Sequence, residues 1–328
     1  MAPTIRLGRT CAAALFVLFA GCSTTHLQHV PHAPLVTTAD GSGEARSGSQ
    51  NAALQNAGTT AAQTGIFARL VFADEFNSGA LDRTKWNVIG PDFWVNNEQQ
   101  AYVDSPDTIR FQPAGSVPGA DGGVMVLMPR FSAGYATPSG RKADFISGRI
   151  DTRGNFEFTH GRAAARIRMP DAVGVWPAFW LLGNGKWPDT GEIDIMEYVG
   201  EKDWVGVALH GPGYSGETPL VNKYYFDGGI DVTDWHVYAV EWTNREMLFK
   251  VDERILYRVT RPMVEHYGAW VFDTPKFVIL NFALGGAYPF KTNGIKQPYN
   301  GLPADTVERI KSGDIAMEVD WVRVHRAD

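Results

Sequence analysis

The stretch GEIDIMEYVG, Gly191–Gly200, places three carboxylates within six residues of an otherwise apolar, β-prone run. Side chains of a strand point alternately to opposite faces, so Glu192 and Asp194 share one face. Strict alternation would turn Glu197 into the apolar face, where a charge without a partner is costly. One extra residue at Ile195–Met196, a β-bulge, would return Glu197 to the face of the other two acids. The stretch therefore predicts a bulged strand with three acids on one surface.

Three acids on one surface repel one another, which pushes their pKa values apart, so one carboxyl stays protonated while another stays ionised. Glycoside hydrolysis needs such a division between an acid and a nucleophile. The alternative is an exposed edge strand whose charges only prevent aggregation. Just upstream, VWPAFWLLGNGKWPDT crowds Trp176, Trp180 and Trp187 beside the acids. Aromatic faces stack on the apolar faces of sugar rings, so these neighbours favour a glycosidase.

The motif Glu-x-Asp-x-x-Glu, preceded by Trp-Pro-x-Phe-Trp at 176–180, resembles the signature of glycoside hydrolase family 16, in its bulged, laminarinase-like branch of endo-β-1,3-glucanases. Further matching runs are NNEQQAY at 96–102, GRAAARIRMP at 161–170, LHGPGYSG at 209–216, LNFALGG at 280–286 and VDWVRV at 319–324. The resemblance extends from Phe67 to the C-terminus. It implies a concanavalin-like β-jelly-roll sandwich and a mechanism that retains the anomeric configuration.

The resemblance also implies a role for each acid. Glu192 is the expected nucleophile, and Glu197 is the expected acid that protonates the leaving oxygen and then activates water. Asp194 between them is expected to hold Glu192 by a hydrogen bond. The three tryptophans are expected to stack sugars, and the chemistry requires no cofactor.

Three more residues are candidates for substrate binding. His210 begins a His-Gly-Pro-Gly-Tyr turn that could overhang the acids, although a lone histidine there is otherwise a surface residue. Asn96 lies in the NNEQQAY run, whose amide side chains offer both donors and acceptors to sugar hydroxyls. The alternative for that run is a solvated edge. Arg149 is a cleft candidate by resemblance only.

Length and patterning predict one catalytic domain over residues 66–328. The 328 residues are 44% apolar, enough for a large core in a single all-β domain. Short β-rich runs recur between Gly, Pro, Asn and Asp, without a long amphipathic helix. The strand candidates are 123–128, 158–169, 235–243, 247–251, 276–283 and 317–324. Small and apolar residues alternate with arginines in 158–169, which predicts one buried and one wet face. We expect an antiparallel two-sheet sandwich.

Residues 1–21 predict a lipoprotein-type signal peptide. Arg6 and Arg9 give a positive start, and Cys11–Ala20 is an uncharged apolar run too short to span a bilayer. The run LFAGC, ending at Cys22, resembles a bacterial lipobox, with Phe where Leu is usual. The alternative is an ordinary signal peptide beside an incidental cysteine.

Cys22 would be the single cysteine of the mature chain, which could then form no internal disulfide. Acylation there would anchor the protein to a membrane surface. Ser23 after it fits outer-membrane sorting by resemblance to other lipoproteins. We expect an exported monomer, an outer-membrane lipoprotein facing the periplasm or cell surface, or otherwise a secreted protein.

Residues 22–65 read as a flexible linker, because Ser, Thr, Ala, Gly, Gln and Asn dominate without an apolar period. Without Arg6 and Arg9 the chain has 28 basic and 36 acidic residues, a net charge near −8. This balance excludes nucleic acid as an expected partner. It argues weakly against highly sulfated polysaccharides and favours a neutral glucan.

A structural calcium ion is a further expectation from the resemblance, since family members often carry one between the first and last strands. The matching positions are Glu75, the Gly123 region and Asp320, and oxygen ligands suit calcium. Zinc has no predicted ligand set, because the mature chain keeps one Cys and lacks paired His spacing.

The sequence thus predicts a retaining endo-β-glucanase that hydrolyses internal β-1,3 linkages of laminarin-type glucans. Two alternatives stay open at this point. One is a non-catalytic carbohydrate-binding sandwich, since fold does not fix function. The other is a transglycosylase or hydrolase acting on another polysaccharide, such as a mixed-linkage glucan or a galactan.

Overall fold

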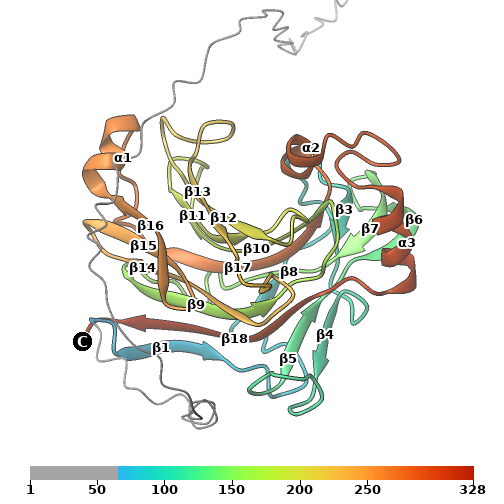
Figure 1. The fold of residues 1–328 in the computed structure, drawn as a ribbon, viewed down its shortest axis with the longest axis horizontal. Coiled ribbons are helices and arrows are strands. Elements are labelled where there is room, and N and C mark those ends of the chain that lie inside the picture. The colour runs from blue at the N-terminus through green and yellow to red at the C-terminus, as the bar shows by residue number, and fades with distance from the viewer. Residues whose placement is uncertain (1–65) are drawn as a thin grey trace, which may run out of the picture. The chain divides into compact units, whose positions relative to one another are not determined.

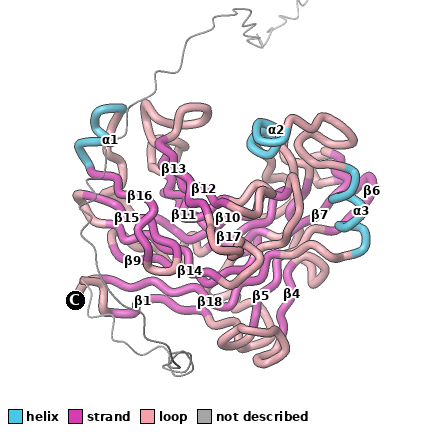
Figure 2. The backbone as a smooth tube through the Cα atoms, viewed as in Figure 1, coloured by secondary structure: helices cyan, strands magenta, loops and turns pink. Residues whose placement is uncertain are grey.

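The computed structural model describes residues 66–328 of the chain. The predicted signal peptide (1–21), Cys22 and the predicted linker (22–65) lie outside the described residues. Within 66–328, strands form two large sheets, and three short helices lie at the periphery (Figures 1 and 2). The expected all-β sandwich is confirmed. None of the three helices is long and apolar enough to cross a membrane.

The back sheet has eight strands. In order across the sheet these are β16 (Arg254–Thr260), β15 (Glu246–Val251), β14 (His236–Trp242), β9 (Gly161–Arg168), β18 (Met317–Arg326), β5 (Val124–Leu127) and β4 (Ile109–Gln112), with β1 (Arg69–Asp74) also paired to β18. Neighbours are antiparallel. The first and last strands of the domain therefore lie side by side.

The front sheet has seven strands and carries the acid stretch near its middle. Its order is β13 (Leu220–Tyr225), β12 (Trp204–His210), β11 (Glu192–Glu197), β10 (Val175–Gly183), β17 (Lys276–Leu284), β8 (Arg149–Asp151) and β2 (Asn87–Val88). These pairs are antiparallel too. Strands far apart in sequence thus meet beside β11.

A small third sheet joins β3 (Gln100–Tyr102), β7 (Lys142–Ser147) and β6 (Arg130–Ala136). Its β3–β7 pair is parallel, an exception to the expected antiparallel pattern. The helices are α1 (Arg261–Tyr267), α2 (Ala287–Asn293) and α3 (Ala304–Ser312). All are too short to form a layer of their own.

The core fills the space between the two large sheets. The front sheet contributes Phe179, Leu181, Ile193 and Met196, and the back sheet contributes Ala163, Ala165, Ile167 and Val240, all buried in one apolar cluster. Alternation then turns the acids of β11 to the other side of the front sheet, which we call the open face. The fold thus separates the apolar core from the site by a single layer of backbone.

The second face of β9 is less wet than the sequence predicts. Ala164 is buried in a small cluster with Ala239 and Trp321. Arg162 is also buried and pairs with Glu253. Side chains from neighbouring strands cover this face, which alternation along one strand cannot reveal.

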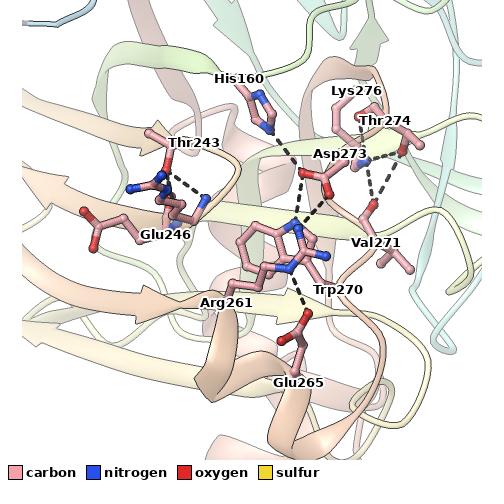
Figure 3. Close-up of polar contacts among 11 residues, drawn as sticks. His160, Thr243, Glu246, Arg261, Glu265, Trp270, Val271, Asp273, Thr274 and Lys276 are labelled. Atoms are coloured by element: carbon pink, nitrogen blue, oxygen red, sulfur yellow. Dashed lines mark hydrogen bonds and ion pairs between the residues drawn. The ribbon is translucent and has the colours of Figure 1, made fainter.

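The loop before β17 is tied down by a polar network, which Figure 3 shows around Asp273 and Lys276. The ammonium of the buried Lys276 donates to the carbonyls of Val271 and Thr274, at 3.2 and 2.9 Å. Asp273 accepts hydrogen bonds from Arg261 and from the indole of Trp270. Helix α1, which carries Arg261, is thereby held to the loop that leads into the front sheet.

The same loop packs against the turn that precedes the acids. Gly191 has φ +73°, and a Cβ there would lie 3.0 Å from Val271 and Phe272. Glycine is therefore needed both for the backbone conformation and for the close approach. The turn places Glu192 at the start of β11.

Candidate active site

The acid strand β11 contains the bulge that the sequence predicts. Trp180 of β10 pairs with Asp194, but the preceding Phe179 pairs with Met196, so Ile195 is the extra residue. On the other side, the register with β12 also shifts between Asp194 and Glu197. Met196 is fully buried in the core. The bulge thus brings Glu197 to the open face.

Glu192 is held by two side chains from adjacent segments. The indole of Trp187 donates to its Oε2 at 2.8 Å, and Nε2 of His210 lies 3.9 Å from its Oε1. The same nitrogen is 3.4 Å from Oδ2 of Asp194. Trp187 stays 44% exposed, so one residue both fixes the carboxylate and presents an aromatic surface.

His210 places its Nε2 beside the acids, although Oδ2 of Asp194 accepts no hydrogen bond from the described residues. The backbone N–H of Gly216 donates to its Nδ1 at 3.3 Å, so the ring proton of the neutral imidazole lies on Nε2. Within residues 66–328, Glu192, Asp194 and His210 form the only group of three possible metal ligands whose atoms lie within 4.8 Å of one another. Because a ligating Nε2 would need the proton on Nδ1, the geometry favours the donor role.

Glu197 lies beneath aromatic side chains. The indole of Trp176 donates to its Oε1 at 3.0 Å, and the ring of Tyr288 meets that indole edge to face at 5.6 Å. Gly206 of β12 pairs with Glu197, and a Cβ at this glycine would come within 3.3 Å of the Tyr288 hydroxyl. The absent side chain leaves room for Tyr288, a residue that the sequence did not single out.

Burial changes the acidity of the whole acid trio, Glu192, Asp194 and Glu197. It raises the pKa of Glu192 to about 8 and that of Glu197 to about 7. Burial and the charge of Glu197 raise the pKa of Asp194 well above its ordinary range. The trio therefore retains protons at neutral pH that exposed carboxyls lose.

Trp180 and Arg149 extend the open face away from the acids. The Trp180 indole donates to Oδ1 of Asn281 at 2.7 Å. The guanidinium of Arg149, which is 4% exposed, lies 4.8 Å from the Trp180 ring and 4.2 Å from the ring of Phe93. Asn281 was missed, although an amide inside the apolar run of β17 was a usable signal.

The NNEQQAY run does not line the face as one polar strand. Asn96 is exposed in a loop at φ +55°, and its amide donates to Glu98 at 3.3 Å. Glu98 is buried and also accepts from Gln100 and from the hydroxyl of Tyr102. Tyr102 in turn accepts from Asn281. The run therefore supports the site through the hydrogen bonds that link Glu98 and Tyr102 to Asn281. Within the described residues, no hydrogen bond joins Asn96 to the acid trio.

The expected calcium position is occupied by arginine contacts. Arg323 binds both carboxylate oxygens of Glu75, at 2.8 and 2.7 Å. Asp320 accepts from two backbone N–H groups, at Asp121 and Gly122, and pairs with Arg166. A cation would have to displace a guanidinium from each carboxylate. These two side chains, as they lie, do not fit a calcium site.

Comparison with known proteins agrees with this architecture. The family model for glycosyl hydrolases family 16 matches residues 123–297. The chain therefore belongs to glycosyl hydrolase family 16 and is a glycoside hydrolase, which confirms the resemblance drawn from the acid motif.

Three relatives illustrate the similarity. A beta-glucanase of Rhodothermus marinus is 36% identical over 275 residues, covering 78% of this chain and 85% of that protein. Glucan endo-1,3-beta-glucosidase A1 of Niallia circulans is 29% identical over 282 residues, covering 78% of this chain but 38% of that protein. The structure of an endo-beta-1,3-glucanase from Pyrococcus furiosus matches with a TM-score of 0.66 and 31% identity, covering 79% of this chain and 94% of that chain.

Proposed function

We propose that this protein is an endo-β-1,3-glucanase that hydrolyses internal linkages of laminarin-type glucans with retention of configuration. The observation that carries the proposal is the bulged strand β11, which presents the buried Asp194 and the half-buried Glu192 and Glu197 to one face beside Trp176, Trp180 and Trp187. Relatives named as beta-glucanase and endo-1,3-beta-glucosidase support the substrate class. A non-catalytic sandwich would gain nothing from grouping these charges.

The assignment of roles weighs two opposing effects on Glu192. Burial, and after it repulsion from Asp194, raises the pKa of Glu192 to about 8, above the value of about 7 for Glu197. However, burial and the charge of Glu197 raise the pKa of Asp194 well above its ordinary range, and protonation of Asp194 removes its repulsion of Glu192. The indole of Trp187 and the imidazole of His210 then favour an ionised Glu192. We assign Glu192 as nucleophile and Glu197 as acid.

In the first step, the Glu192 carboxylate bonds to the anomeric carbon while Glu197 gives its proton to the departing glycosidic oxygen. In the second step, the Glu197 carboxylate takes a proton from water. The oxygen of that water bonds to the anomeric carbon and releases Glu192. Two inversions give net retention, and both carboxyls return to their starting states.

Azide rescue tests the two roles. Glu192→Ala should lose turnover by about 10³-fold or more, and azide should enter the vacated space to give an α-glycosyl azide from an activated substrate. Glu197→Ala should still form the covalent intermediate with a good leaving group, and azide should then give the β-glycosyl azide. NMR of the products separates these anomers.

Glu217→Ala serves as control, because this carboxylate is 82% exposed and forms a surface ion pair with Lys291. Its turnover should match the wild type. The same anomer from both active-site variants, or inversion by the wild type, would contradict the assignment.

The substrate class is tested by reducing-end release from purified polysaccharides. Laminarin should be cut faster than mixed-linkage glucan, agar or carrageenan. Activity confined to a galactan would remove the glucan assignment and leave the acid roles standing. Product analysis at high donor concentration separates hydrolysis from glycosyl transfer.

We also propose export and lipid anchoring through Cys22, on the strength of the apolar run and the LFAGC sequence that ends at this residue. The wild type should fractionate with membranes, and Cys22→Ser should be released. A soluble wild type would contradict the anchor without bearing on catalysis.

A further inference from the structure

The loop between β2 and β3 exposes three consecutive apolar side chains. Phe93, Trp94 and Val95 are 36%, 46% and 40% exposed. Single exposed apolar residues are common on protein surfaces, but a contiguous group that includes a large aromatic ring marks a surface that binds something.

Trp94 is held in a fixed orientation. Its indole N–H donates to the carbonyl of Glu98 at 2.7 Å. The guanidinium of Arg141 lies 5.5 Å from the ring centre and itself donates to the carbonyl of Gln100 at 3.1 Å. One side of the indole is thus covered by a cation while nearly half of the side chain stays exposed. A ring held in this way is preorganised to bind a flat partner.

Through Phe93, this loop is connected to a row of side chains that begins at the acid trio. Trp180 is paired with Asp194 on the neighbouring strand. The guanidinium of Arg149 stacks on the ring of Trp180 and also on the ring of Phe93. The series runs from β11 over β10 and β17 to β8. Three strand spacings amount to about 14 Å, so Trp94, next to Phe93, lies well away from the reacting bond.

We propose that Trp94 forms a remote subsite that stacks a glucosyl ring of the same glucan chain whose internal linkage lies at the acid trio. The proposal rests on the glucanase function proposed above. A pyranose ring presents an apolar face of C–H groups, and an electron-rich indole is the side chain that best matches it. The Nε1–H is already used by Glu98, so the ring contributes shape and dispersion and no further hydrogen bond. The subsite therefore favours glucan chains that are long enough to reach Trp94.

The test compares kcat/KM across β-1,3-linked gluco-oligosaccharides of increasing length. In the wild type, kcat/KM should rise when a substrate becomes long enough to reach Trp94. Trp94→Ala should reduce the ratio of kcat/KM between the longest and shortest substrates by about fivefold to tenfold, mainly through KM. Trp94→Phe keeps an aromatic face but loses the bond to Glu98, and should give an intermediate ratio.

Tyr267→Ala is the matched control, because Tyr267 is a 58% exposed aromatic residue on α1, outside the loop. It should leave the length dependence as in the wild type. A Trp94→Ala ratio equal to that of the wild type, or an equal loss on short and long substrates, would overturn the subsite.

Binding without turnover separates this proposal from the function on which it rests. Calorimetric titration of the longest oligosaccharide into Glu192→Gln should show weaker binding when Trp94→Ala is added. Unchanged affinity overturns the subsite even if the wild type cuts glucan. Weakened binding alongside a wild type that cuts no glucan supports the stacking and overturns the glucanase function.

Discussion

Two groups of carboxylates in this domain differ in whether cationic side chains neutralise their charge. At the junction of β1 and β18, Glu75 and Asp320 each bind an arginine, and Asp320, only 1% exposed, also accepts two backbone N–H groups. On the open face, Asp194 is also buried and Glu192 and Glu197 are half-buried, but within the described part of the chain none of the three has an arginine or backbone N–H partner. Within residues 66–328, the only basic side chain within 4.0 Å of the acid trio's oxygens is His210.

The difference shows where the fold neutralises charge and where it does not. A buried carboxylate that is fully paired stays a structural element, and losing its partner is costly. A buried carboxylate that faces other carboxylates instead holds protons at neutral pH, and the folded state bears that cost. Proton transfer to a leaving oxygen requires the second arrangement. The site is therefore expected to be a source of instability that the core offsets.

The largest expected effect concerns the pH dependence of stability. Burial and mutual repulsion raise the pKa of all three acids of the trio on folding, so between about pH 4.5 and pH 8 the folded chain binds more protons than the unfolded chain. The free energy of unfolding therefore falls as pH rises through this window, by roughly 5 kcal/mol in total. Glu192→Gln removes one of the three coupled acids and should reduce that decline. Urea unfolding of both proteins at pH 5 and pH 8 measures it, and parallel curves would contradict the expectation.

Breaking the paired group should cost nearly as much. Asp320→Asn removes the buried anion that the half-buried Arg166 pairs with, and we expect the free energy of unfolding to fall by about 3–5 kcal/mol. Turnover per folded molecule should not change. Asp121→Asn is the control, since this carboxylate is 65% exposed and lies 3.7 Å from the same arginine. Equal effects from the two variants would show that burial of the pair is not what matters.

Lys276 sharpens the comparison as a buried cation whose hydrogen bonds go to three neutral oxygens, of Val271 and Thr274 (Figure 3). Burial lowers its pKa from 10.5 to about 8, so between these values the unfolded chain binds more protons. Stability contributed by this site should rise with pH across that window, by about 3 kcal/mol. Lys276→Met should lack this rise, whereas the exposed Lys311→Met should retain it. Chemical unfolding at pH 8 and pH 10 distinguishes the two variants.

The smallest expected effect is that of calcium. Since Arg323 and Arg166 already occupy the carboxylates of Glu75 and Asp320, chelation should leave the melting temperature unchanged within about 1 °C. Calorimetry with EDTA and with added calcium provides the measurement. A clear rise of the melting temperature with calcium would mean that the cation displaces these arginines or binds elsewhere.

Much of the fold and the centre of the site could be predicted from sequence. Alternation marked the strands, and the spacing of Glu192, Asp194 and Glu197 required a bulge that the structure contains. Both are local signals, because side-chain direction along a strand follows from the backbone itself. The same reasoning failed for β9, where a neighbouring strand brings Trp321 over Ala164.

The partners of the polar residues could not be predicted in this way. Arg323 donates to Glu75, which lies 248 residues earlier in the sequence, and Trp180 donates to Asn281, which lies 101 residues later. Short-range contacts add to these long-range pairs: Asn96 donates to Glu98, and Trp187 donates to Glu192 while presenting its ring. Sequence by itself determined which residues face the same side of a strand. Only the tertiary structure decided which charges are neutralised, because strand order and register bring distant side chains within hydrogen-bonding distance.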